Sequence, residues 1–224
     1  MKTLINKYDK DLIPGLPRVL FPGRIEVVLN LADTKKAVKS LMTPNTAPNG
    51  DIIQPILGFD TETRPSFSRK HPNKVALLQV CRDNICYLFR LNYIGFPLCL
   101  QRLLEDDKII KVGLSWNDDV RALNTRHDFK SGKFVELQKL AGEMGLKDKS
   151  LQKLYANFFK QRISKAQTMS NWDAEYLTDA QMKYAATDAW ACVRLYEEMM
   201  KLKREGYFLE VRPEVEPQKS PISH

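Results

Sequence analysis

Two carboxylates end a short apolar segment in the first third of the chain. Residues 56–63 read ILGFDTET, and Asp60 and Glu62 stand two positions apart in this segment. Because side chains alternate along a β-strand, both carboxylates lie on one face if the segment is extended. Paired carboxylates can bind a hard cation such as Mg²⁺. Ordinary solvated acids at the end of a strand give the same pattern.

A second acid stands in a long segment that is predicted to be helical, from about residue 179 to 203. The preceding Thr178 and Gln181 have the spacing of a capping box, which places the start of the helix near Thr178. Tyr184 and Asp188 are four residues apart and therefore lie on one helix face. Small and apolar neighbours make an uncompensated acid costly here, unless Asp188 pairs with a surface lysine and Tyr184 is an ordinary half-buried aromatic.

A third acidic position follows the predicted strand KIIKVG, residues 108–113. The next residues include Asp118 and Asp119, near the start of a predicted helix. The carboxyl ends of strands are the usual site region of open α/β sheets, although either acid could simply favour the positive end of its helix. If all these acids converge, their repulsion raises their pKa values unless a cation lies between them. Two Mg²⁺ or Mn²⁺ ions would then suit phosphodiester cleavage.

Hydrophobic periodicity and turn residues predict strands that precede and then alternate with helices. We expect an α/β domain with a mixed sheet. Its limits are residues 24–204, between an irregular lead-in (1–23) and a polar, disordered tail (205–224). The predicted strands cover 24–31, 56–63, 75–81, 85–89 and 108–113, and the helices cover 33–42 with Asp33 as N-cap, 96–106, 117–125, 136–145, 151–159 and 179–203.

Composition supports a polyanionic partner and a location in a reducing compartment. The 224 residues carry 35 Lys and Arg against 27 Asp and Glu, a formal charge of +8. The four cysteines lack a CxxC spacing, which favours buried thiols over zinc or disulfides, although Cys81 and Cys86 could close a hairpin. No export signal or membrane span is predicted, so we expect a cytoplasmic protein without membrane contact.

The segments FDTET, DDVRAL and YAATDAW resemble, in order and approximate separation, the three motifs of the DEDD 3′-to-5′ exonucleases. The resemblance runs from about residue 24 to 202 and implies an RNase H-like fold. The spacing of four residues between the tyrosine and the last acid resembles that of the tyrosine branch of the family. This branch includes ribonuclease D and the Werner syndrome exonuclease domain. The histidine branch has its histidine five residues before that acid, where this chain has Lys183.

The resemblance implies a role for each matching residue. Asp60, Glu62, Asp119 and Asp188 would hold two divalent ions, Mg²⁺ or Mn²⁺, and Tyr184 would orient the attacking water and help to deprotonate it. Asp119 is preferred to Asp118 because the family motif places an aliphatic residue next and a leucine four positions on. The implied activity is the removal of nucleotides from the 3′ end of DNA or RNA.

Two basic segments are candidates for contact with a nucleic-acid strand, residues 64–74 and 160–172. Phe67 and Trp172 in them could stack on bases, although a solvated loop and a core tryptophan explain them equally well. Expected partners are single-stranded or 3′-recessed DNA or RNA, and a separate helicase or other protein. Two alternative functions fit the same motifs: an inactive module that binds nucleic acid, and a phosphohydrolase that acts on small phosphates.

Overall fold

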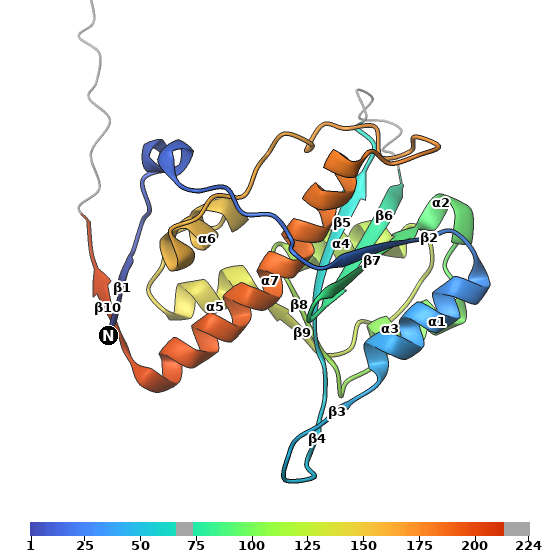
Figure 1. The fold of residues 1–224 in the computed structure, drawn as a ribbon, viewed down its shortest axis with the longest axis horizontal. Coiled ribbons are helices and arrows are strands. Elements are labelled where there is room, and N and C mark those ends of the chain that lie inside the picture. Colours follow the sequence, from blue (N-terminus) through green and yellow to red (C-terminus); the bar gives the residue numbers. More distant parts are fainter. Residues whose placement is uncertain (66–73, 213–224) are drawn as a thin grey trace, which may run out of the picture.

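A six-stranded mixed sheet forms the centre of the molecule (Figure 1). The computed structural model describes residues 1–65 and 74–212. Within them the strand order is β2-β7-β6-β5-β8-β9. Strands β5, β6 and β7 are antiparallel neighbours, whereas β2 pairs with β7, and β8 with β5 and β9, in parallel. The bounds are β2 Arg24–Val28, β5 Ile56–Thr63, β6 Val75–Arg82, β7 Ile85–Arg90, β8 Ile110–Gly113 and β9 Phe134–Glu136.

Helices cover both faces of this sheet, and each face has its own apolar core. One core joins the sheet to α5, α6 and α7, and the other joins it to α1, α3 and α4. The predicted mixed sheet flanked by helices is therefore confirmed. The helices are α1 Leu31–Met42, α2 Leu91–Ile94, α3 Leu98–Glu105, α4 Trp116–Asn124, α5 Leu137–Glu143, α6 Leu151–Phe159 and α7 Asp179–Glu205.

Successive side chains of strand β5 point alternately into the two cores. Leu57 and Phe59 are buried in the core beneath α1, α3 and α4, so Gly58 and Asp60 face α7. A Cβ atom at Gly58 would lie 2.0 Å from the carbonyl oxygen of Ala189 in α7. Only a glycine allows the helix backbone this close, and the contact places Asp188 beside the end of β5.

Capping side chains fix the starts of two helices. Thr178 and Gln181 form the predicted capping box at the start of α7. At α1 the prediction was wrong, because the N-cap is Asn30 and its side-chain oxygen accepts a hydrogen bond of 2.9 Å from the Asp33 backbone. The strand before α1 ends at Val28, which leaves Asn30 free to take the extended conformation that an N-cap requires.

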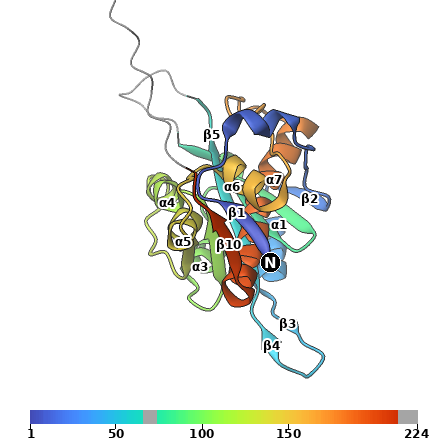
Figure 2. The same cartoon turned by 90° about the vertical axis from the view of Figure 1, so that its left-hand side faces the viewer.

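The two ends of the described chain lie together, and the prediction of an irregular lead-in is partly wrong. Strand β1 (Lys2–Ile5) pairs in parallel with β10 (Tyr207–Glu210), as Figures 1 and 2 show. The Asn157 side chain of α6 accepts a hydrogen bond of 3.0 Å from the Ile5 backbone N–H and donates one of 2.6 Å to the Ile5 carbonyl. A 3₁₀ helix, η1 (Lys10–Gly15), follows. The predicted disordered tail therefore begins with a strand, and residues 213–224 lie outside the described residues.

A second small sheet stands in the segment that was predicted to be a loop. Strands β3 (Asn45–Thr46) and β4 (Ile52–Ile53) pair there as an antiparallel hairpin. The hairpin projects from the end of the molecule that lies below the central sheet in Figure 1. Among the helices that the structure describes, none combines the length and the apolar character that a bilayer crossing requires.

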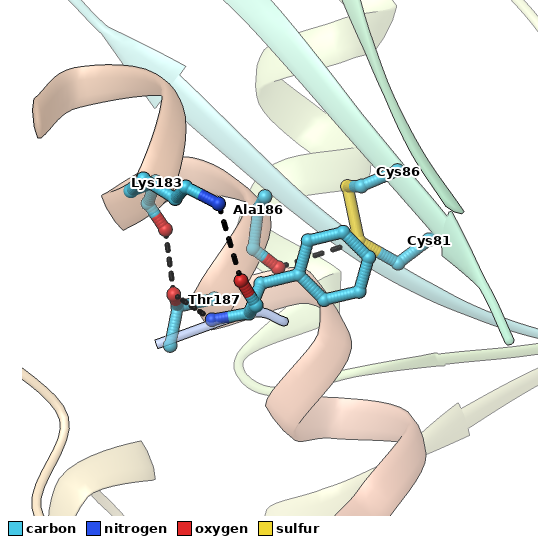
Figure 3. Close-up of a disulfide and its surroundings, with 6 residues drawn as sticks. Cys81, Cys86, Lys183, Ala186 and Thr187 are labelled. Carbon is cyan, nitrogen blue, oxygen red and sulfur yellow. Dashed lines mark hydrogen bonds between the residues drawn. A yellow bond between two sulfur atoms is a disulfide. The ribbon is translucent and has the colours of Figure 1, made fainter. Parts of the chain in front are cut away.

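The prediction of buried free thiols is wrong for two of the four cysteines. Cys81 and Cys86 are bonded as a disulfide across the β6–β7 hairpin, with their Cα atoms 4.0 Å apart (Figure 3). The hairpin register makes these residues direct cross-strand partners, which brings their sulfur atoms together. The Cys81 sulfur also lies 3.3 Å from the Ala186 carbonyl oxygen of α7. Cys99 and Cys192 are free, but only Cys192 is buried as predicted, whereas Cys99 is half-buried.

Candidate active site

Three carboxylates from two elements lie together where β5 meets α7. Asp60 and Glu62 come from β5 and Asp188 from the third turn of α7, and one carboxylate oxygen of each lies within 4.8 Å of the other two. Strand alternation and the close approach at Gly58 are sufficient to produce this grouping. The sequence prediction that these acids converge agrees with the geometry.

Asp119 of α4 faces the same region, whereas its neighbour Asp118 faces solvent. The Thr61 hydroxyl, between the two β5 acids in sequence, donates a hydrogen bond of 2.5 Å to Asp119 Oδ1. The Asp118 side chain is 77% exposed and lies 3.3 Å from Arg121 on the outer face of the helix. Of the adjacent acids, Asp119 is therefore the one that faces the cluster.

Replacing each of these neighbours with asparagine gives a matched test of this geometry. Asp119→Asn should reduce hydrolysis of a labelled oligonucleotide about a hundredfold or more, since it removes a charge from the site. Asp118→Asn should change the rate less than about twofold, because an exposed ion pair on a helix surface contributes little. A steady-state assay of both variants checks the ranking, and the opposite ranking would assign the site to Asp118.

Burial raises the pKa values of all four carboxyls, and the charge of neighbouring acids raises them further at Asp60, Glu62 and Asp119. Loss of solvent is the main cause at each one. The neighbouring charges of Asp119, Asp188 and Glu62 further raise the pKa of Asp60, and burial raises the pKa of Glu62 to about 9. The pKa values of Asp119 and Asp188 rise to about 7. The site is therefore built to hold positive charge, because the acids repel one another without it.

The Tyr184 hydroxyl lies at the edge of this cluster. It is within 3.2 Å of the Thr168 hydroxyl, and the Tyr184 ring stands 6.1 Å from the ring of Trp172. Burial, followed by the charge of Asp188, raises the pKa of the Tyr184 hydroxyl far above its usual value. In the metal-free protein the phenol therefore stays protonated and acts as a hydrogen-bonding group. The predicted help in deprotonating water at a metal-loaded site stays a prediction.

The two residues predicted to stack on bases have different outcomes. Trp172 is fully buried and packs beside Tyr184, so its prediction as a base-stacking surface is wrong. The sequence could not reveal this burial, because a tryptophan in a basic segment suits either location. Phe67 lies outside the described residues, and its contact with a strand stays a prediction.

Two polar residues of the site were not singled out from the sequence. Glu136, at the end of β9, accepts hydrogen bonds from the backbones of Ser115 (2.9 Å) and Trp116 (2.7 Å) and thereby fixes the start of α4. Gln79 lies directly across from Asp60 on β6, fully buried, and its side-chain amide has no partner within the described residues. Strand pairing places Gln79 there, and no local motif could have indicated it.

The chemistry of the four carboxylates fits divalent cations with a preference for oxygen ligands. Asp188 Oδ1 is buried and has no hydrogen-bond partner among the described residues. A buried carboxylate oxygen without a partner is costly, and a cation held with Asp60 and Glu62 would satisfy it. All four proposed ligands are carboxylates, with no His or Cys in the set, and this favours Mg²⁺ or Mn²⁺ over zinc.

Comparison with known proteins identifies the family of the chain. Residues 31–203 match the family described as 3′-5′ exonuclease. An Arabidopsis thaliana protein named 3′-5′ exonuclease is 32% identical over 191 residues, which cover 82% of this chain and 66% of that protein. The mouse bifunctional 3′-5′ exonuclease/ATP-dependent helicase WRN is 31% identical over 191 residues, 83% of this chain and 13% of that protein.

A solved structure has the same fold. The Trypanosoma brucei RNase D complex with RNA U12 superimposes with a TM-score of 0.64 at 22% identity, over 80% of this chain and 63% of that one. The fold is therefore RNase H-like, and the chain belongs to the 3′-5′ exonuclease family. The chain spans less than two thirds of the length of the two sequence relatives.

Proposed function

We propose that the protein removes nucleotides from the 3′ end of DNA or RNA by two-metal-ion phosphodiester hydrolysis, as a member of the tyrosine branch. The observation that supports this most is the grouping of Asp60, Glu62 and Asp188, with Asp119 linked to them through Thr61. Family membership supports a nuclease, and the RNA in the related RNase D complex supports a nucleic-acid substrate.

Each residue has a separate task in this proposal. The four acids hold two divalent ions, which when bound supply a nucleophile at neutral pH and neutralise charge on the scissile phosphate. Thr61 holds the Asp119 carboxylate in place. Tyr184, protonated, donates a hydrogen bond that orients the attacking water or a phosphate oxygen. Trp172 and Thr168 fix the position of the Tyr184 ring and hydroxyl.

Tyr184→Phe should slow the chemical step about a hundredfold, the usual effect of removing one positioned hydrogen-bond donor, while strand affinity changes little. Single-turnover cleavage and anisotropy of a labelled strand in EDTA measure the two quantities separately. Tyr207→Phe is the matched control. The Tyr207 hydroxyl donates a hydrogen bond to the Met144 carbonyl near the carboxyl end of α7, which is the end far from the acidic cluster. Equal single-turnover rates for Tyr184→Phe and the parent would remove Tyr184 from the reaction.

Product analysis tests the function itself. The protein is incubated with 5′-labelled single-stranded DNA, 3′-recessed DNA and matching RNA, in Mg²⁺, Mn²⁺ or EDTA, and products are separated by length. We expect a ladder that shortens from the 3′ end only with a divalent ion, and the relative rates rank DNA against RNA. Binding without cleavage in any ion would instead support an inactive nucleic-acid-binding module.

Location and protein partners belong to the proposal as well. A cytoplasmic site of action and a separate helicase or other protein partner stay predictions from the sequence. The Cys81–Cys86 disulfide favours an oxidising compartment over the cytoplasm, because disulfides persist mainly in oxidising compartments. Thiol labelling of the protein in cell extract, before and after reduction, would reveal whether this pair is oxidised where the protein acts.

A further inference from the structure

A pocket of about 430 Å³ lies between η1, the start of α6 and the segment that follows α6. Among the lining residues that the structure describes, none is acidic. Its charged members come from all three segments and are Lys10, Lys153, Arg162 and Lys165. The pocket is thus a concentration of positive charge that the amino-terminal segment helps to build.

Neighbouring contacts hold part of this charge in position. Arg162 Nε donates a hydrogen bond of 2.9 Å to the Leu16 carbonyl, which fixes the guanidinium group at the wall. Lys153 lies 3.5 Å from the buried Asp148, which compensates one of the four charges. Lys10 and Lys165 are exposed, so these two side chains are available to an anion that enters the pocket.

The pocket is connected to the acidic cluster by a short piece of chain. Lys165 lines the pocket, and Thr168, three residues later, contacts the Tyr184 hydroxyl at 3.2 Å. Three residues span at most about 10 Å, and a turn shortens this path because the Thr168 backbone bonds the Lys165 carbonyl at 3.2 Å. One short segment, from Lys165 to Thr168, therefore joins the wall of the pocket to the Tyr184 hydroxyl.

We propose that this pocket binds a backbone phosphate of the substrate strand, at a distance from the scissile bond. This inference rests on the proposed nuclease function. A strand is the favoured occupant because a polyanion is drawn to clustered Lys and Arg by release of its counterions, and the acidic cluster nearby receives the end of that same strand. The segment around Lys10 then takes part in strand binding together with the basic stretch after α6.

The test compares substrates that do and do not reach the pocket. Lys10→Gln/Lys165→Gln should lower kcat/KM for a single-stranded 12-mer about tenfold, mainly through KM, and should reduce the salt slope by one to two. Cleavage of a dinucleotide should not change.

The matched control is Lys35→Gln/Lys39→Gln, which removes two exposed lysines of α1 on the other side of the sheet. Parental kcat/KM on the 12-mer, or an equal loss on the dinucleotide, would overturn the proposal.

Binding measurements keep the pocket testable if no hydrolysis is seen. Anisotropy of a fluorescent 12-mer in EDTA should show weaker binding by the Lys10/Lys165 variant and parental binding by the control. If the protein cleaves nothing yet binds in this manner, the proposed function fails and the pocket stands. If the Lys10/Lys165 variant loses affinity for inorganic phosphate, measured by titration calorimetry, but binds the 12-mer as the parent does, the pocket is a site for free phosphate and the strand assignment is wrong.

Discussion

Replacing Asp60 with asparagine is expected to reduce hydrolysis at least about a thousandfold, equivalent to about 4 kcal/mol of transition-state stabilisation. Asp60 is the carboxylate whose pKa is influenced by the other three acids of the cluster. This central position makes it the ligand best placed to be shared by two ions. Its loss should therefore disrupt the whole cation site, whereas loss of a peripheral ligand should weaken it.

The same variant should be more stable than the parent when no metal is present. Asparagine keeps the size of aspartate but removes one charge from a group of acids that lie close together, of which Asp188 is buried and the other three are half-buried. At pH 8 in EDTA the midpoint of thermal unfolding should rise, and Mg²⁺ or Mn²⁺ should no longer raise it further. Asp51→Asn, an exposed acid between β3 and β4, is the control and should change neither rate nor midpoint. Activity near the parental level in Asp60→Asn would remove the assignment.

The metal-free protein is expected to become markedly less stable between pH 5 and pH 8. The pKa values of the site carboxyls in the folded state lie above their unfolded values, so the folded state binds more protons in this range. Their stabilising effect is complete below about pH 4 and is lost as the pH rises through about 7 for Asp119 and Asp188 and about 9 for Glu62. Asp188, 8% exposed, on its own contributes about 3 kcal/mol to the loss between pH 5 and pH 8.

Urea unfolding at several pH values in EDTA, repeated with Mg²⁺ or Mn²⁺, measures this effect. Divalent ions bind the ionised carboxylates of the folded state, so they should restore stability most at pH 8, where the metal-free protein is weakest. Asp188→Asn should flatten the pH dependence in EDTA. A metal-free stability that stays constant or increases from pH 5 to pH 8 would contradict the raised pKa values and the close grouping of the acids.

Local sequence signals predicted the elements of the site well. The alternation in ILGFDTET places Asp60 and Glu62 on one face of β5, and the capping box before α7 sets the register that brings Tyr184 and Asp188 to one side. Both rest on the regular geometry of a strand or a helix, which the chain shows within a few residues. The choice of Asp119 over Asp118 rests on the family motif and agrees with the structure, in which Asp119 is half-buried and bonded to Thr61 while Asp118 is exposed.

Features that depend on contacts between distant segments were not predicted. The pairing of β1 with β10 joins residues about two hundred positions apart and leaves no local pattern. Burial of Trp172 depends on how the segment after α6 folds over α7, and the partnerless amide of Gln79 depends on strand register. The sequence allows the Cys81–Cys86 bond but does not require it, because spacing alone does not separate a cross-strand disulfide from two buried thiols.

The proposed hydrolysis depends on two divalent ions held by the four carboxylates. Anomalous X-ray scattering from crystals of the protein soaked with Mn²⁺ and a nucleoside monophosphate measures this directly. We expect two manganese peaks about 4 Å apart, both among Asp60, Glu62, Asp119 and Asp188, and no such pair in Asp60→Asn. Full occupancy of the product with no manganese peak at these carboxylates would show that the four acids do not form the metal site.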